Sequence, residues 1–234
     1  MARSRYQTLG PEDVDNAESR ALSLRAAQEG IVLLQNNAVQ EEDEGEEAGT
    51  GGGGAPLLPL KKGLKLAFIG PHANSTQSLL SNYHGSNKVV NSHSPLLAAQ
   101  AAGLSVTHAM GCNICDFPVG GNPGFPNMPC PDGKAKDKSM FPAAVAAAKA
   151  ADVAVVFMGS DQTTEAENYD RREIALSGVQ EELLAAVVAA NPRTVLVLIN
   201  GGPLAVKTFR NASFAMMPFC AQNDPFTKTG SGQT

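Results

Sequence analysis

Short apolar runs, separated by polar and glycine-rich segments, recur along most of this chain. Runs of about four to eight apolar residues without polar alternation are typical of strands buried on both faces of a parallel sheet. The clearest run is Val153–Met158, which ends at Gly159. The same pattern predicts further strands over residues 64–71, 104–109 and 193–199, and one more that begins at Ala215.

The segments between these runs carry helical patterns. Residues 177–191 show the clearest one, because five apolar residues recur there on one helix face. Helices are also predicted over residues 94–103, with Pro95 in the first turn, and over residues 142–151, with Ser139 as the cap. Alternating strands and helices with long crossovers predict an α/β fold, a doubly wound and mostly parallel sheet with helices on both faces.

The N-terminal part has a weaker pattern. Residues 16–30 are predicted to form a helix that Asn16 caps and that Gly30 ends in a left-handed conformation. An apolar stretch over residues 30–35 predicts a short strand after it. We therefore expect residues 1–36 to form a linker with a helix and an edge strand.

Two segments do not fit the alternation. Residues 37–56 contain an acidic block that runs into polyglycine, which cannot bury apolar surface and is expected to be a disordered insert. A literal GxGxxG lies in it at residues 49–54, but no strand precedes it, so it does not indicate nucleotide binding. Residues 221–234 are expected to be a disordered tail, which leaves residues 57–220 as an α/β sandwich domain.

Composition and charge argue against two classes of partner. The net charge is −5 and no basic stripe is visible, which argues against nucleic acid. No apolar run reaches membrane-spanning length, and the first residues have no apolar region typical of a signal peptide. We therefore expect neither a nucleic-acid partner nor a membrane partner.

The four cysteines leave two alternatives open. Cys112 and Cys115 have the spacing of half a zinc site, but no second pair of ligands lies nearby, so no metal is predicted. A disulfide within residues 111–131 is one interpretation, and unpaired loop thiols are the other.

Four carboxylates follow the clearest predicted strand: Asp161, Glu165, Glu167 and Asp170. In open α/β sheets, ligands bind at the carboxyl ends of the strands. The loop is therefore a candidate functional site, although Glu167 and Asp170 are equally compatible with solvated surface positions.

The loop sequence also resembles a known family. Residues 158–171, MGSDQTTEAENYDR, closely resemble the acid/base loop of glycoside hydrolase family 3, in the plant-type β-D-xylosidase/α-L-arabinofuranosidase branch. Further similar segments occur in the order of the family: LGPEDV at residues 9–14, AAQEGIVLLQN at 26–36, AFIGPHAN at 67–74, NYHG at 82–85 and LSGVQEEL at 176–183.

The resemblance implies a two-domain enzyme of which this chain is the C-terminal α/β sandwich. A (β/α)8 barrel would supply a nucleophilic Asp, and the sandwich a Glu that protonates the leaving sugar and later activates water. By motif that residue is Glu165, with Glu167 as the runner-up. Asp161 and Arg171 would organise the loop through ion pairs and, with Tyr83 and His84, are candidate substrate contacts.

The family chemistry, hydrolysis of xylan or xylo-oligosaccharides with retention, requires no cofactor and no metal. It requires two carboxyl groups about 5–5.5 Å apart, one of them protonated. We expect the clustered carboxylates to raise the pKa of the acid. Members of the family are mostly secreted, but this sequence shows no signal peptide, so the localisation stays open.

This chain has no room for a barrel of about 250 residues, so we expect the isolated chain to be inactive. Three alternatives stay open: a catalytically inactive sugar-binding or regulatory fragment, a nucleotide-binding α/β protein, and one half of a split enzyme with a separate barrel. His72 and His84 could line a sugar site, but each is expected to be a solvated loop histidine.

Overall fold

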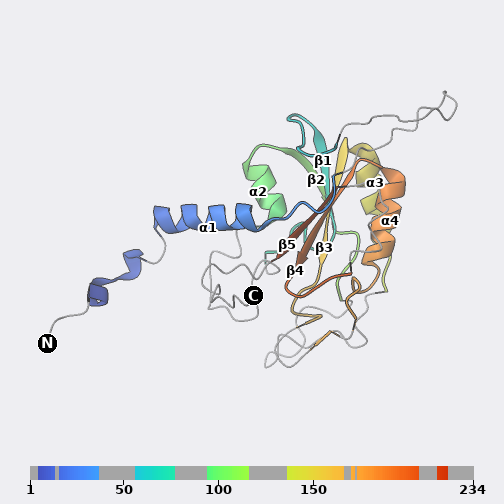
Figure 1. Cartoon of the computed structure of the whole chain (residues 1–234). Coiled ribbons are helices and arrows are strands. Elements are labelled where there is room, and N and C mark those ends of the chain that lie inside the picture. The colour runs from blue at the N-terminus through green and yellow to red at the C-terminus, as the bar shows by residue number, and fades with distance from the viewer. Residues whose placement is uncertain are drawn as a thin grey trace.

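The computed structural model describes residues 5–13, 16–36, 56–76, 94–115, 136–165, 170–171, 173–205 and 215–220 (Figure 1). Within these residues a parallel sheet of five strands has the order β2-β1-β3-β4-β5. The strands are β1 (Lys65–Ile69), β2 (Ser105–Ala109), β3 (Val153–Gly159), β4 (Thr194–Asn200) and β5 (Ala215–Cys220). The helices are α1 (Ala17–Gly30), α2 (Pro95–Ala101), α3 (Phe141–Ala150) and α4 (Gln180–Ala190), preceded by 3-10 turns at Arg5–Thr8 and Pro11–Asp13.

Strand β3 is the centre of the sheet. It pairs with β1 on one side and β4 on the other, and all seven of its residues are buried. Alternate side chains point to opposite faces, so a strand covered on both faces needs an unbroken apolar sequence. The run Val153–Met158 supplies that sequence, and the strand predicted there is confirmed.

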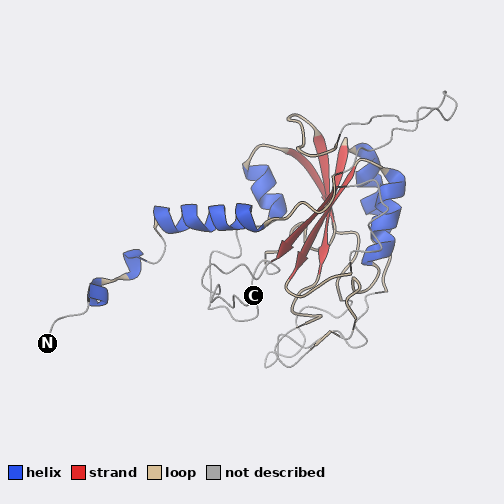
Figure 2. Cartoon of the chain, in the orientation of Figure 1, coloured by secondary structure: helices blue, strands red, loops and turns tan. Residues whose placement is uncertain are grey.

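Helices cover both faces of the sheet (Figure 2). On one face, α3 and α4 pack against the even-numbered residues of β3, through side chains such as Ala144, Leu183 and Val187. On the other face, α2 and residues 57–64 pack against Phe157 and its neighbours. The Phe157 ring lies 4.8 Å from the Phe68 ring, centroid to centroid. The doubly wound fold predicted from the sequence is confirmed.

Gly159 determines how the chain leaves β3. Its φ is +151°, and a Cβ placed on it would lie 1.7 Å from the backbone oxygen of Ile199 in β4. Only glycine fits such a close approach of two backbones. The loop that follows therefore begins directly against the end of β4.

The N-terminal helix differs from its prediction at its end. Asn16 does cap α1, by accepting a hydrogen bond from the Ser19 N–H at 2.8 Å. Gly30, however, is not left-handed, and the helix ends at Ile31 in an extended conformation. No residue of α1 is buried, and Figure 1 shows the helix projecting away from the sheet.

The predicted edge strand at residues 30–35 is wrong. Only Gln35 takes part in an isolated β-bridge, and the four apolar residues before it, Ile31 to Leu34, are exposed. An apolar run becomes a strand only where a neighbour offers its backbone for pairing, and within the described chain this run has no such neighbour beyond that one bridge.

The predicted Ser139 cap is also wrong. Helix α3 begins at Phe141, and the Ser139 hydroxyl donates to the Asp137 carboxylate at 2.9 Å instead. A cap at Ser139 would bind the N–H two or three residues on. Phe141 already donates its N–H to the Lys138 carbonyl, and Pro142 has none.

Some sequence-based expectations fall outside the described residues. These are the disordered insert, apart from Pro56, and the disordered tail. No described helix is both long enough and apolar enough to cross a membrane.

We predict that Leu183→Ala lowers the free energy of unfolding by about 2–5 kcal/mol, because Leu183 is fully buried between α4 and the sheet. Leu22→Ala on α1 is the control, since Leu22 is 59% exposed and its truncation is expected to cost about 0.5 kcal/mol or less. Urea unfolding at pH 7 measures both. An equal loss of unfolding free energy in the two variants would contradict this prediction, because it would show that α1 packs as tightly as α4.

Candidate active-site loop

Three segments meet at the carboxyl edge of the sheet. The loop after β1 reaches β3 through a hydrogen bond from the His72 N–H to the Phe157 carbonyl, 3.3 Å long. The loop after β3 contains Ser160 to Glu165, and the turn after β4 contains Gly201 to Leu204. Parallel neighbours bring their carboxyl ends to the same edge, so the sheet itself gathers these segments.

The Glu165 carboxylate is held from three directions. Its Oε1 accepts from the Ser160 hydroxyl at 2.6 Å and from the Gly202 N–H at 3.2 Å. Its Oε2 accepts from Arg171 Nε at 2.7 Å. We call Ser160, Arg171 and Gly202 the carboxylate clamp, since they bind both oxygens of a side chain that stays 25% exposed.

Arg171 connects two loops. Its Nε binds Glu165, and its Nη2 donates to the Pro203 carbonyl at 2.6 Å in the turn after β4. Its side chain is only 11% exposed, and its Nη1 is buried with no hydrogen-bond partner in the described part of the chain. The predicted loop-organising ion pair of Arg171 is therefore confirmed, with Glu165 as its partner.

The clamp lowers the pKa of Glu165. Burial acts to raise that pKa, but hydrogen bonds from Ser160 and Arg171, the charge of Arg171 and the Gly202 N–H together lower it. The expectation that clustered carboxylates raise the pKa of the acid is wrong for this chain. Among the described residues, three hydrogen-bond donors lie against the Glu165 oxygens, one of them the Arg171 cation, and no second carboxylate does.

Asp161 organises a turn. Its Oδ1 accepts from the Thr163 N–H at 2.9 Å and from the Thr163 hydroxyl at 2.5 Å, while its carbonyl accepts from the Thr164 hydroxyl. Within the described residues Thr163, and not an arginine, binds the carboxylate, so the ion pair predicted for Asp161 is not present there.

His72 lies beneath this loop. It is only 1% exposed, and neither ring nitrogen has a hydrogen-bond partner among the described residues. Burial lowers its pKa to about 4, which the nearby Asp161 carboxylate and the Ser160 backbone only partly offset. The expectation of a solvated loop histidine is therefore wrong, and His72 is neutral at pH 7.

The Gln180 side chain binds the backbone at the end of β3. This fully buried side chain accepts from the Gly159 N–H at 2.9 Å and donates to the Gly159 carbonyl at 3.0 Å. It satisfies both backbone groups of the residue from which the loop departs. The sequence signals neither this role nor that of Gly202, because each depends on a contact between distant segments.

Several predicted site residues cannot be placed. Glu167, Tyr83 and His84 lie outside the described residues, and Asp170 is exposed. Cys112 is a buried thiol and Cys115 is disulfide-bonded, so these two do not bond to each other. Among the described residues no cluster of His, Cys, Asp or Glu could hold a metal ion.

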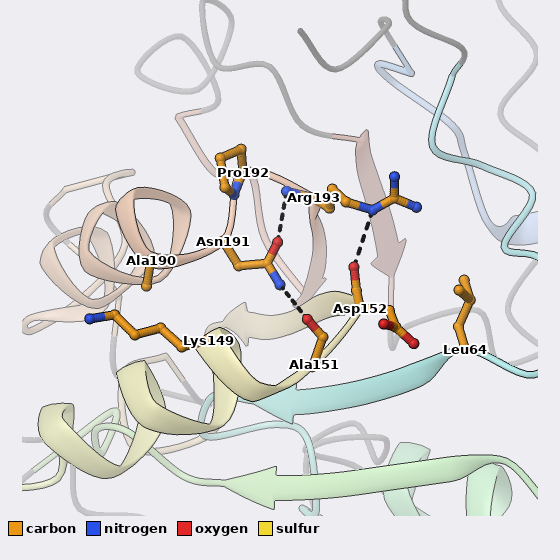
Figure 3. A pocket seen from close by; sticks show the side chains of 8 residues that line it. All are labelled: Leu64, Lys149, Ala151, Asp152, Ala190, Asn191, Pro192 and Arg193. Carbon is orange, nitrogen blue, oxygen red and sulfur yellow. Dashed lines mark hydrogen bonds between the residues drawn. The ribbon is translucent and has the colours of Figure 1, made fainter. Parts of the chain in front are cut away.

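A shallow depression of about 500 Å³ lies at the opposite, amino-terminal edge of the sheet (Figure 3). Its polar groups serve the fold: Asn191 donates to the Ala148 and Ala151 carbonyls, and Arg193 Nε donates to the Asp152 carbonyl. The Asp152 carboxylate accepts the Lys65 N–H. The depression therefore marks the junction of the crossovers, and the chemistry gathers at the other edge.

Residues 31–220 match the family model described as the glycosyl hydrolase family 3 C-terminal domain. Among curated proteins, β-D-xylosidase 3 of Arabidopsis thaliana is 34% identical over 88% of this chain. A probable exo-1,4-β-xylosidase of Neosartorya fischeri is 34% identical over 84%. The chain spans only 22% and 20% of these two relatives.

Solved structures show the same architecture. A GH3 exo-β-xylosidase, XlnD, determined in complex with a xylobiose aziridine activity-based probe, superposes with a TM-score of 0.71 and 28% identity. The match covers 93% of this chain and 24% of that one. A GH3 β-glucosidase of Bifidobacterium adolescentis gives a TM-score of 0.64 and 26% identity, over 90% of this chain and 26% of that one.

We predict that His72 makes the free energy of unfolding decrease as the pH falls below 6.5. Unfolded histidine has a pKa of 6.5 and folded His72 one of about 4, so the unfolded state binds the proton first. The stabilisation is complete above pH 6.5 and is lost as the pH falls toward 4, by about 3 kcal/mol at most. Urea unfolding across this range should show the loss in the native chain and a flatter profile in His72→Gln. Parallel profiles would contradict it.

We predict that Arg171→Met lowers the free energy of unfolding at pH 7 by about 1–3 kcal/mol, because Glu165 loses its cation. The folded pKa of Glu165 lies below its unfolded value of 4.5, so its stabilisation is present above pH 4.5 and disappears at lower pH. The loss of unfolding free energy caused by Arg171→Met should therefore become smaller as the pH falls below 4.5.

The control is Lys138→Met, which breaks the ion pair with Glu182. Both side chains of that pair are about half exposed, so the loss should be about 0–1 kcal/mol. A cost of Arg171→Met that is the same at pH 7 and pH 3 would contradict the role assigned to the Glu165 charge.

Proposed function

The chain belongs to glycoside hydrolase family 3 as its C-terminal domain, and on that basis we propose that it supplies the general acid/base Glu165 to a retaining β-xylosidase-like hydrolase. The observation that carries this proposal is the placement of Glu165. It is a partly exposed carboxylate at the carboxyl edge of the sheet, held by donors from two adjacent loops.

The role follows from the chemistry of retaining hydrolysis. One carboxyl group protonates the departing oxygen, a second attacks the sugar, and the first then removes a proton from the attacking water. Glu165 takes the first role in this proposal. The nucleophile belongs to the barrel domain that the family resemblance implies, and the substrate is a xylo-oligosaccharide or related glycoside.

Because the carboxylate clamp lowers the pKa of Glu165, that pKa must rise before Glu165 can protonate the leaving group. With a lowered pKa, Glu165 is ionised at neutral pH, which is the form that activates water. Donation of a proton requires that the pKa rise when barrel and substrate close over the loop. Arg171 is the group to move, since its cation favours the ionised form of Glu165. Its Nη2 is bound to the Pro203 carbonyl in the turn after β4, so a shift of Arg171 would also break that bond.

Asp161 and Arg171 stay candidates for substrate contact, as do Tyr83 and His84. The buried Arg171 Nη1, which has no partner in the described chain, is a donor that a sugar hydroxyl could use after a small shift of the loop. Glu167 stays the runner-up for the acid/base role.

One observation favours the alternative, a catalytically inactive sugar-binding or regulatory fragment. A carboxylate held ionised by an arginine is poorly prepared to donate a proton. Saturable binding of xylobiose without turnover, in the presence of a barrel domain, would support this alternative.

We predict that the isolated chain does not turn over aryl β-xylosides, and that activity appears when it is combined with the barrel portion of a relative such as β-D-xylosidase 3. In that pair, Glu165→Gln should lower kcat/KM by about 10²–10⁴-fold on xylosides with a poor leaving group. The loss should be far smaller for a dinitrophenyl leaving group, which departs without protonation.

Glu173→Gln, an exposed carboxylate on the same loop, is the matched control and should leave both rates unchanged. Equal losses for good and poor leaving groups would remove Glu165 from the acid role. Turnover by the isolated chain that disappears on Glu165→Gln would show that no barrel is needed.

A further inference from the structure

We propose that Gly202 is a positioning residue for Glu165: the space left by its missing side chain lets the turn after β4 close directly on the Glu165–Arg171 ion pair. The catalytic meaning of this inference rests on the function proposed above. Its structural content stands on the geometry of the turn alone.

The first observation is the direct contact. The Gly202 N–H donates to Glu165 Oε1 at 3.2 Å, across 37 residues of sequence. A backbone donor moves less than a side chain, so this bond ties the orientation of the carboxylate to the end of β4. The Ser160 hydroxyl donates to the same oxygen from the end of β3. The carboxylate is thus fixed between two neighbouring strands.

The second observation concerns space. A Cβ on Gly202 would lie 2.8 Å from Glu165 Oε2 and 3.2 Å from Arg171 Nη2. Both distances are shorter than a carbon atom normally keeps from these groups. Any side chain at position 202 would therefore displace the two partners of the ion pair.

The third observation concerns the backbone conformation of Gly202. Gly202 is not among the glycines with a left-handed φ, unlike Gly159 or Gly178. Its backbone is one that other residues can adopt. The turn after β4 therefore needs glycine here for the sake of the carboxylate, and not to turn the chain.

The turn has contacts besides the one with Glu165. Asn200 Nδ2 donates to the Gly202 carbonyl at 2.7 Å, and the Pro203 carbonyl accepts from Arg171 Nη2. These two hydrogen bonds hold the turn, and with it the Gly202 N–H, in place. Substitution there should move the carboxylate and the guanidinium more readily than the turn.

The test is a double-mutant cycle with the wild-type chain, Gly202→Ala, Glu165→Ala and the double variant, each unfolded in urea at pH 7 and at pH 3. We expect Gly202→Ala to lower the urea midpoint at pH 7 and to lower it less at pH 3, because the stabilisation by the Glu165 charge decreases below the unfolded pKa of 4.5. In the Glu165→Ala background we expect Gly202→Ala to leave the midpoint unchanged. A role in turn geometry alone would give the same loss at both pH values and in both backgrounds.

Gly30→Ala, the same chemical change at the end of α1, is the matched control and should give no coupling to Glu165. If Gly202→Ala fails to fold, recovery of folding in the double variant supports the proposal, and failure of the double variant while Glu165→Ala folds overturns it. An unchanged midpoint in Gly202→Ala also overturns it. No readout depends on hydrolysis, so the result is independent of whether Glu165 is the acid/base.

Discussion

The burial of β3 on all sides is the constraint on which the rest of the molecule depends. Seven consecutive residues lie between β1 and β4, under α3 and α4 on one face and α2 on the other. Such a strand has no room for a polar side chain, so polar chemistry can begin only where the strand ends. Gln180 and Gly159 fix that point, and the loop with Glu165 starts one residue later.

The second consequence is that Glu165 is defined by its neighbours in the sheet and not only by its own loop. Donors from the ends of β3 and β4 and the cation of Arg171 bind the two carboxylate oxygens. These contacts favour the ionised form over the protonated one. In the proposed hydrolase the domain would thus present a base, and conversion to an acid would belong to the assembled active site, where substrate and barrel replace water around the loop.

The sequence predicts what depends on local pattern. The apolar runs of β1, β3 and β4, the Asn16 cap, and an arginine that organises the carboxylate loop were all expected and are present. Features that depend on distant partners were missed: the burial of His72 and the hydrogen bond from Gly202 to Glu165. The apolar run at residues 30–35 failed for the same reason, since strand formation requires a partner that the run itself does not encode.

The most direct test of this account is an NMR titration of the side-chain carboxyl carbons in the native chain. The account predicts that Glu165 titrates below its unfolded pKa of 4.5, because the clamp stabilises its charge. A Glu165 midpoint at or above 4.5 would contradict the account, since the three donors at its oxygens would then not be stabilising the charged carboxylate.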